Sequence, residues 1–180
     1  MTVNRLLAGF GLLTAAFLLA ASRVHVNASW SDDAWGYLLL PMGKPQVGDI
    51  VIFDPPEDLR ASAPYLKRVL GVPGDAVDVD GTGEVWLNGE PVARAKPRAL
   101  DGRVLVPVAP ATIPAGHYYL HADHADSHDS RYAEIGLVPR ERILGRAVAL
   151  PDVAWLGLEG PLVKPHVDCG SDRCEPGSAP

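Results

Sequence analysis

Tyr65-Leu66-Lys67-Arg68-Val69-Leu70-Gly71-Val72-Pro73-Gly74-Asp75 is the stretch that decides the fold, because it places one lysine inside an apolar run. The run lacks helical spacing and closes with Gly-Val-Pro-Gly-Asp, so we expect a buried strand that ends in a tight turn. Loss of hydration lowers the pKa of a buried lysine. A pKa of about 7 to 8, instead of about 10.4, leaves enough neutral amine at pH 7 for a general base. Lys67 is therefore a candidate base, although a lysine that extends into solvent beside Arg68 fits the same stretch.

The composition favours a mainly β protein. The 180 residues are enough for one modest domain and a short appendage. The 18 glycines and 17 prolines are too many for a helical bundle and are typical of a fold rich in turns. The net charge of -6 offers no basic surface for phosphates, so we expect no nucleic acid partner.

An uncharged apolar segment runs from Leu6 to Ser22, between Arg5 and Arg23. We expect this segment to form a helix that anchors the chain in a membrane. A cleaved signal peptide is the alternative, because Leu19-Ala20-Ala21 ends in small residues.

Three further stretches accompany the lysine stretch: Asn27-Ala28-Ser29-Trp30-Ser31, Val47 to Phe53 and Ser127-His128-Asp129-Ser130-Arg131-Tyr132. Together, and in this order, they resemble the signal peptidase I family of serine/lysine peptidases over about residues 26 to 150. The short chain, the Asn-x-Ser-x-Ser start and Pro114-Ala115-Gly116-His117-Tyr118 are most similar to the TraF-type, pilin-processing branch of conjugative transfer. The resemblance implies a signal peptidase-like antiparallel β-sheet catalytic domain over 26–150. A membrane anchor over 1–25 would precede it, and a Pro/Gly-rich tail over 151–180 would follow.

The resemblance also implies a catalytic pair. Ser31 corresponds to the nucleophile and Lys67 to its general base. Ser29 corresponds to a hydroxyl that, with the backbone N–H of Ser31, forms the oxyanion hole. Asp32 and Asp33 depart from the family pattern, and we expect both to point into solvent because a carboxylate near Lys67 would stabilise the ammonium.

In the late stretch, the resemblance implies that Ser127 orients the lysine amine and that Asp129 and Arg131 form a supporting ion pair. The same region is rich in His and Asp, which by composition alone suggests a metal site through His121, Asp123 and His124. This signal is weak without matching cysteines or a His-Glu helix. The expected mechanism needs no metal and no cofactor.

The rest of the chain is predicted to form short strands and loops. Strands are expected at 24–26, 49–53, 76–79 and 84–87, with Asn88-Gly89 as a hairpin turn. Residues 96–103 are expected to form a solvated loop and no binding patch. Cys169 and Cys174 suggest a disulfide in an exported domain.

The resemblance implies a membrane-bound serine endopeptidase that removes signal or leader peptides from exported precursors, and that matures a conjugative pilin. It would be a single-pass protein of the inner membrane with its catalytic domain on the periplasmic side, and its partners would be the precursor and the membrane. A general signal peptidase I is one alternative. An inactive β-domain scaffold in pilus or secretion assembly is the other, because of the Asp32-Asp33 departure.

Overall fold

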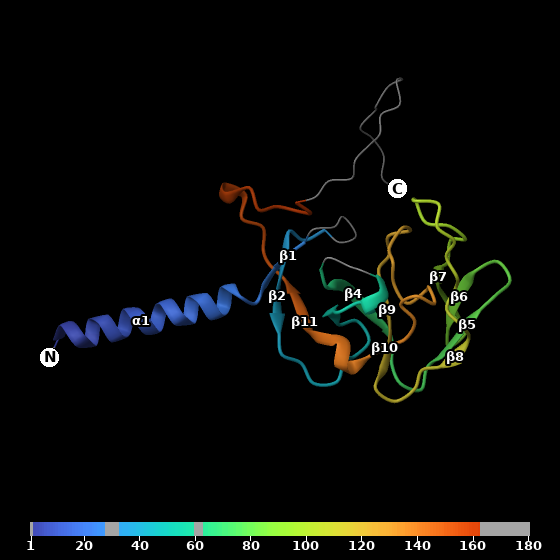
Figure 1. Cartoon of the computed structure of the whole chain (residues 1–180), viewed down its shortest axis with the longest axis horizontal. Helices are drawn as coiled ribbons and strands as arrows, with labels where there is room; N and C mark the ends of the chain where they lie inside the picture. Colours follow the sequence, from blue (N-terminus) through green and yellow to red (C-terminus); the bar gives the residue numbers. More distant parts are fainter. Residues whose placement is uncertain (1, 28–32, 60–62, 163–180) are drawn as a thin grey trace, which may run out of the picture.

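The computed structural model describes residues 2–27, 33–59 and 63–162. Two antiparallel sheets form the domain, and helix α1 (Thr2–Ala21) protrudes from it (Figure 1). The larger sheet has the order β1-β2-β11-β3-β4-β9-β10 and contains β1 (Val24–Val26), β2 (Gly36–Leu40), β3 (Ile50–Phe53), β4 (Tyr65–Gly71), β9 (His117–His121), β10 (Val138–Pro139) and β11 (Ile143–Ala149). The smaller sheet has the order β7-β6-β5-β8 and contains β5 (Ala76–Val79), β6 (Glu84–Leu87), β7 (Glu90–Arg94) and β8 (Ala111–Thr112). Short 3-10 helices occur in the connections: η1 (Glu57–Leu59), η2 (Arg140–Arg142) and η3 (Ala154–Leu156). The prediction of a mainly β fold is confirmed.

Strand β4 is the buried strand expected from the sequence, and it ends in the expected turn. It lies between β3 and β9, with Lys67 opposite Val51. After β4, the backbone N–H of Asp75 donates to the carbonyl of Val72 at 3.1 Å, and Gly74 has a φ of +100°. A proline followed by a glycine with positive φ is the sequence that a type II turn requires.

The Asn88-Gly89 hairpin turn is also confirmed. Asn88 and Gly89 have φ values of +51° and +84°, as a type I′ turn between β6 and β7 requires. The Asn88 side chain accepts a hydrogen bond from the N–H of Ala76 and donates one to Asp75. This turn is therefore fixed to the start of β5 as well.

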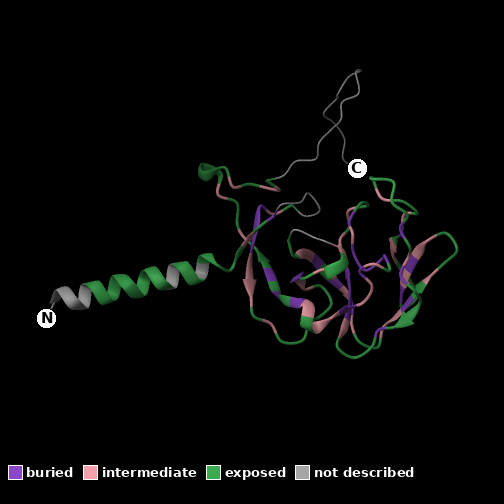
Figure 2. Ribbon diagram, in the orientation of Figure 1, coloured by how far each residue is buried: buried purple, intermediate pink, exposed green. Residues whose placement is uncertain are grey.

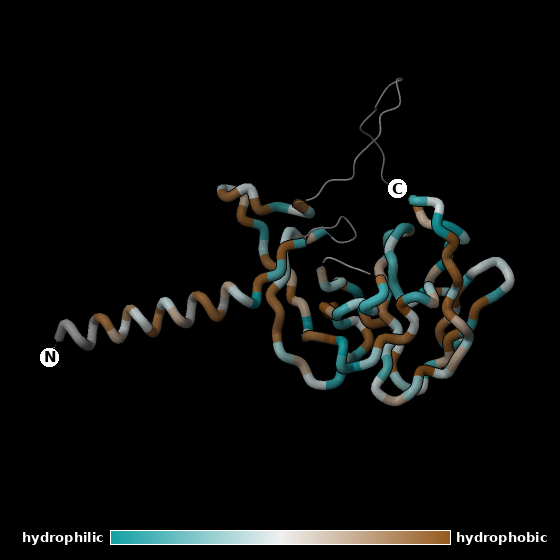
Figure 3. Tube along the Cα trace, viewed as in Figure 1, coloured by the Kyte–Doolittle hydropathy of each residue, from teal (hydrophilic) through white to brown (hydrophobic). Residues whose placement is uncertain are grey.

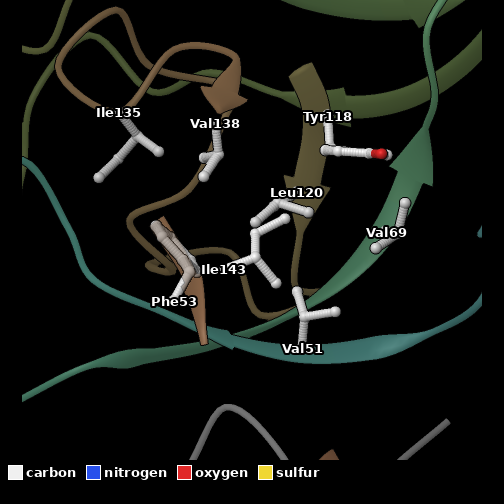
Figure 4. Close-up of a cluster of buried hydrophobic side chains, with 8 residues drawn as sticks. All are labelled: Val51, Phe53, Val69, Tyr118, Leu120, Ile135, Val138 and Ile143. Carbon is white, nitrogen blue, oxygen red and sulfur yellow. The ribbon is translucent and has the colours of Figure 1, made fainter. Parts of the chain in front are cut away.

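Strand β9 separates the two main hydrophobic clusters, because successive side chains of a strand point to opposite faces. Tyr118 and Leu120 pack into the first cluster and Tyr119 into the second. The first cluster lies within the larger sheet (Figure 4), and its buried members are Val51, Phe53, Val69, Tyr118, Leu120, Ile135, Val138 and Ile143. The second cluster joins β9 to the smaller sheet through Val77, Val85, Leu87, Val108 and Ile113. The smaller sheet thus packs against one face of β9, which belongs to the larger sheet.

Helix α1 presents apolar side chains to its surroundings. Where Figure 2 colours the helix by burial, its residues are exposed. Figure 3 shows apolar residues at intervals along the helix. Leu12 and Leu13 are 74% and 72% exposed. The sequence predicted a membrane-spanning helix between Leu6 and Ser22, and a helix forms there. However, no helix in the described part of the chain is both long and apolar enough to cross a membrane.

The first residues of the expected tail contact the domain. The indole N–H of Trp35 donates to the carbonyl of Pro151 at 2.9 Å, and the N–H of Leu150 donates to Gly36. Val153 and Leu158 form a backbone bridge around η3. Cys169 and Cys174 lie outside the described residues, so their disulfide remains a prediction.

Candidate active site

Lys67 lies on β4 with only 8% of its surface exposed. It shares the inner face of the strand with Val69, which is fully buried, whereas Arg68 on the other face is exposed. Its Nζ lies over the ring of Tyr65, 5.5 Å from the ring centroid. The face of the ring stabilises a positive charge, whereas burial disfavours it. The two effects oppose each other at this amine.

A small cavity of about 50 Å³ borders Lys67 and connects β4 to the end of β9. Ile50 and Leu66 line one side of it, and His121 and Ala122 line the other. The lysine therefore lies between an apolar wall and the beginning of the late loop, which follows β9.

The expected nucleophile Ser31 and the oxyanion residue Ser29 lie outside the described residues, as does Asp32. The residues on both sides of this segment are held together. The N–H of Asn27 donates to the carbonyl of Trp35 at 2.9 Å, and Asn27 Nδ2 donates to the carbonyl of Ala34 at 2.8 Å. These bonds extend the pairing of β1 with β2, so both ends of the serine segment are fixed.

Packing links this hairpin to the lysine strand. Ala34 packs against a buried cluster made by Tyr37, Ile52 and Ala147, and Leu66 packs against the same cluster. Leu66 also borders the cavity beside Lys67. Asp33 is exposed, as expected.

The late loop contains the expected ion pair, which is buried. Asp129 is 0% exposed, and Arg131 donates to both of its carboxylate oxygens from Nε and Nη2, each at 2.8 Å. His121 Nδ1 lies 3.1 Å from Asp129 Oδ2, and the N–H of Ala122 donates to the same oxygen. Burial alone would raise the pKa of Asp129, but hydrogen bonds from His121 and Arg131 hold it well below its ordinary value.

The Arg131 guanidinium also fixes the start of the late loop. Its Nη2 donates to the carbonyl of Ala122 at 2.7 Å and to that of His124 at 3.3 Å. Because Ala122 borders the cavity beside Lys67, the ion pair supports the wall that faces the lysine.

Ser127 is 6% exposed, and its Oγ has no hydrogen-bond partner among the described residues. The hydrogen bond expected between this hydroxyl and the Lys67 amine is therefore not part of the described structure. A buried hydroxyl without a partner is costly, so Ser127 Oγ can still accept or donate a bond when substrate binds.

Three residues that we did not single out as site residues form a cluster beside Ser127. Arg103 Nη1 donates to Glu134 Oε2 at 2.7 Å, and His128 Nε2 lies 2.9 Å from the same oxygen, although not in hydrogen-bond geometry. Burial lowers the pKa of His128, and the charge of Glu134 partly offsets this effect. The His128 ring lies between those of Tyr65 and Tyr132, with centroid distances of 6.4 and 5.8 Å.

The His- and Asp-rich region does not form a compact ligand set in the structure. His121 Nε2 is 3.7 Å from Asp123 Oδ1, and the Asp123 side chain is fully exposed. Within residues 2–27, 33–59 and 63–162, no group of three or more His, Cys, Asp or Glu side chains is placed to hold a metal ion.

Comparisons with known proteins match this sequence to one family. A family model described as "Signal peptidase, peptidase S26" matches residues 6–150. Signal peptidase I of Pseudomonas fluorescens is 32% identical over 146 residues, which cover 62% of this chain and 51% of that protein. The chain spans about half the length of the signal peptidase I relatives that it matches.

Two further matches complete the comparison. Conjugal transfer protein TraF of Agrobacterium fabrum strain C58 is 32% identical over 155 residues, which cover 74% of this chain and 84% of that protein. The crystal structure of a signal peptidase I from Enterococcus faecalis V583 is 25% identical with a TM-score of 0.37, and it covers 61% of this chain and 99% of that chain.

Proposed function

Because this chain belongs to the signal peptidase, peptidase S26, family, we propose that it is a serine endopeptidase that removes signal or leader peptides from exported precursors. The buried Lys67 on β4 carries this proposal. It is 8% exposed, and lysine is among the residues that are least often buried to this extent. Its position two residues after Tyr65, beside the wall held by Asp129 and Arg131, supports a role as general base.

In the proposed mechanism, neutral Lys67 takes the proton of the Ser31 hydroxyl, and the alkoxide attacks the scissile carbonyl. Ser29 and the backbone N–H of Ser31 stabilise the oxyanion. Ser127 orients the lysine amine once substrate is bound. The scissile C–N bond then breaks, and Lys67 returns the proton to the leaving amine. Water hydrolyses the acyl-enzyme that remains on Ser31, or its acyl group passes to an amine.

For the substrate, we propose a conjugative pilin precursor. The similarity to TraF of Agrobacterium, a conjugal transfer protein that this chain matches over 84% of its length, supports this choice. A general signal peptidase I function is the second candidate, and the relatives of that name support it. Cleavage is expected after Ala-x-Ala-like sites, because an extended substrate presents alternate side chains to the enzyme and shallow pockets admit only small ones.

We further propose that α1 attaches the enzyme to the cytoplasmic membrane as a single-pass segment, with the catalytic domain outside the cytoplasm. The family match begins at residue 6, within α1. The exposed leucines of α1 supply the apolar surface that such an attachment needs.

The test is processing of a co-expressed precursor by site variants. Ser31→Ala and Lys67→Met should each abolish cleavage while the protein still accumulates. Lys44→Met and Thr112→Ala are matched controls, because both residues are exposed in the structure, and both should cleave normally. Full activity of Ser31→Ala and Lys67→Met would refute the mechanism. Wild-type protein that cleaves no precursor would instead favour the scaffold alternative.

A further inference from the structure

A second, larger cavity lies next to the lysine site. It measures about 360 Å³ and lies between the chain that connects β7 to β8 and the late loop. Six of its lining residues carry the argument: Tyr65, Ala99, Leu105, Ser127, His128 and Tyr132. The Tyr65 ring borders this cavity and also lies under Lys67 Nζ at 5.5 Å. One side chain therefore separates the cavity from the proposed general base.

Half of the lining residues are aromatic or aliphatic, and five others are charged: Lys96, Arg98, Asp101, Arg103 and Asp126. The rings of Tyr65, His128 and Tyr132 follow one another at 6.4 and 5.8 Å between centroids, with interplanar angles of 60° and 46°. These are distances at which aromatic rings attract one another. Because burial lowers the pKa of His128, its ring is neutral at pH 7 and packs as a third aromatic wall. Leu105 is buried against Tyr132.

One polar group in this lining has no partner. Ser127 is 6% exposed, and its Oγ makes no hydrogen bond within the described residues. A buried hydroxyl that borders an open cavity favours a ligand that brings a polar group beside its apolar surface. The backbone of an extended peptide, or the hydroxyl of a tyrosine, has this chemistry.

The outer wall of the cavity is formed before substrate binds. The wall is the 96–105 loop, although the sequence predicts a solvated loop without a binding role for residues 96–103. Lys96 forms an ion pair with Asp126, and its N–H donates to the Tyr132 hydroxyl at 3.2 Å. Arg103 is paired with Glu134 at 2.7 Å. Each exposed pair is weak alone, but together they fix both ends of the loop to the late loop and the segment after it.

We propose that this cavity receives an aromatic side chain of the precursor, at one position near the scissile bond other than the two small residues of the Ala-x-Ala site. The inference rests on the proposed peptidase function and names a further specificity determinant of the same site. An extended substrate rises about 3.3 Å per residue. Because Tyr65 borders the cavity and contacts Lys67, the cavity is within reach of side chains a few residues from a scissile bond held beside this lysine. Its volume lies in the range of pockets that enclose small ligands.

The experiment uses the purified full chain in detergent and a model precursor with one apolar export segment and an Ala-x-Ala site. Each of the five residues on either side of the scissile bond, except the two small ones, is changed in turn to Ala, Leu or Phe. We expect one position at which Phe raises kcat/KM about tenfold over Ala, with Leu between them. If no position prefers Phe while the Ala precursor is cleaved, the inference is wrong and the proposed function stands. If no precursor is cleaved, the proposed function itself fails.

A cavity-filling variant tests whether the aromatic side chain binds in this cavity. Ala99→Trp should abolish the preference for Phe, so that the Phe and Ala precursors are cleaved with equal kcat/KM. Val104→Trp is the matched control, because Val104 lies on the same loop, is 59% exposed and does not line the cavity. It should keep the preference. Ala99→Met fills less space and should reduce the preference partly, which provides a second variant if the tryptophan disturbs folding. Retention of the full preference in both Ala99 variants would overturn the assignment.

Discussion

Asp129 is a fully buried carboxylate whose charge is balanced by Arg131. Removing one partner of such a pair leaves the other charge buried without compensation, which costs about 3 to 5 kcal/mol. We therefore expect Asp129→Asn to lower the free energy of unfolding by about this amount. Urea unfolding of the full chain in detergent measures it. Asp78→Asn, on the exposed side of β5, is the control and should change the stability little.

The same carboxylate predicts a pH dependence. Its pKa in the folded protein is lowered by His121 and Arg131 against the opposing effect of burial. As the pH falls below about 4, the ordinary pKa of Asp, the unfolded chain takes up a proton that the folded protein does not. The stabilisation is therefore complete above about pH 4 and is lost progressively below it. Between pH 6 and pH 3, the free energy of unfolding should fall more steeply for the wild type than for Asp129→Asn. Equal slopes would contradict a lowered pKa of Asp129.

In the proposed mechanism, the Ser29 hydroxyl stabilises the oxyanion while Ser31 attacks the carbonyl. A fixed donor to the oxyanion contributes about 2.7 to 4 kcal/mol to transition-state stabilisation, so Ser29→Ala should lower kcat about 10² to 10³-fold without abolishing cleavage. Single-turnover cleavage of the model precursor measures this step. An inactive Ser29→Ala variant together with an active Ser31→Ala variant would mean that the two roles are exchanged.

At the scale of residues, local pattern identified Lys67 but could not identify His128. The apolar run around Lys67 and the turn after it lie within eleven consecutive residues, Tyr65 to Asp75. By contrast, Arg103, His128 and Glu134 meet only because the 96–105 loop folds back onto the late loop. No spacing along the chain indicates such a contact. For the same reason the sequence alone did not indicate that this loop lines a cavity.

Strand β11 connects the two halves of the candidate site, because it pairs with β2 on one side and β3 on the other. The close pairing with β2 depends on Gly145. A Cβ at this position would lie 2.5 Å from the Leu40 carbonyl oxygen and 2.8 Å from a Leu39 methyl group. A backbone oxygen cannot move aside without displacing its strand.

We therefore expect Gly145→Ala to destabilise the domain by about 1 to 3 kcal/mol, as overpacking does. Thermal unfolding followed by circular dichroism measures the change. The control is Gly81→Ala, because a Cβ at Gly81 would meet no atom within 4 Å. Its melting temperature should stay the same or rise slightly. A Gly145→Ala variant as stable as the control would show that β2 and β11 have room to separate.

At the scale of elements, the strands with a clear local pattern were predicted well. The expected strands at 24–26, 76–79 and 84–87 correspond to β1, β5 and β6 without a shift, and the expected 49–53 begins one residue later as β3. Pairing partners were not predictable in the same way. β11 is more than one hundred residues from β2, and the two strands meet through backbone pairing and through the packing of Ala147 against Tyr37 and Ile52.

In the whole molecule, the lysine strand lies in the larger sheet beside β9, and one face of β9 packs against the smaller sheet. Tyr118 and Leu120 on one face of β9, and Tyr119 on the other, fix the relative position of the sheets. The 96–105 loop leaves the smaller sheet after β7 and reaches the late loop, which follows β9. The larger cavity therefore exists only in the assembled domain. This is why it could not be inferred from the sequence of either sheet.

Helix α1 supplies the last prediction, which concerns attachment to the membrane. Leu12 and Leu13 are 74% and 72% exposed near the middle of the helix. Each lysine introduced into the centre of a membrane-inserted helix costs about 2.5 to 3.5 kcal/mol. The double substitution Leu12→Lys and Leu13→Lys should therefore move most of the protein from the carbonate-washed membrane fraction to the soluble fraction. An alkaline phosphatase fusion after Pro180 should be active in the wild type and lose activity in the variant.

The matched control for this prediction is the double substitution Val104→Lys and Val106→Lys. Both valines are similarly exposed, at 59% and 57%, but they lie on the β domain. This control should stay in the membrane fraction, because α1 is intact and the two substituted residues are not part of the proposed attachment. If the α1 variant also stays there, the helix is not what holds the protein to the membrane. If the wild-type fusion is inactive while the protein remains in the membrane fraction, α1 binds from the cytoplasmic side, and the enzyme cannot reach a precursor outside the cytoplasm.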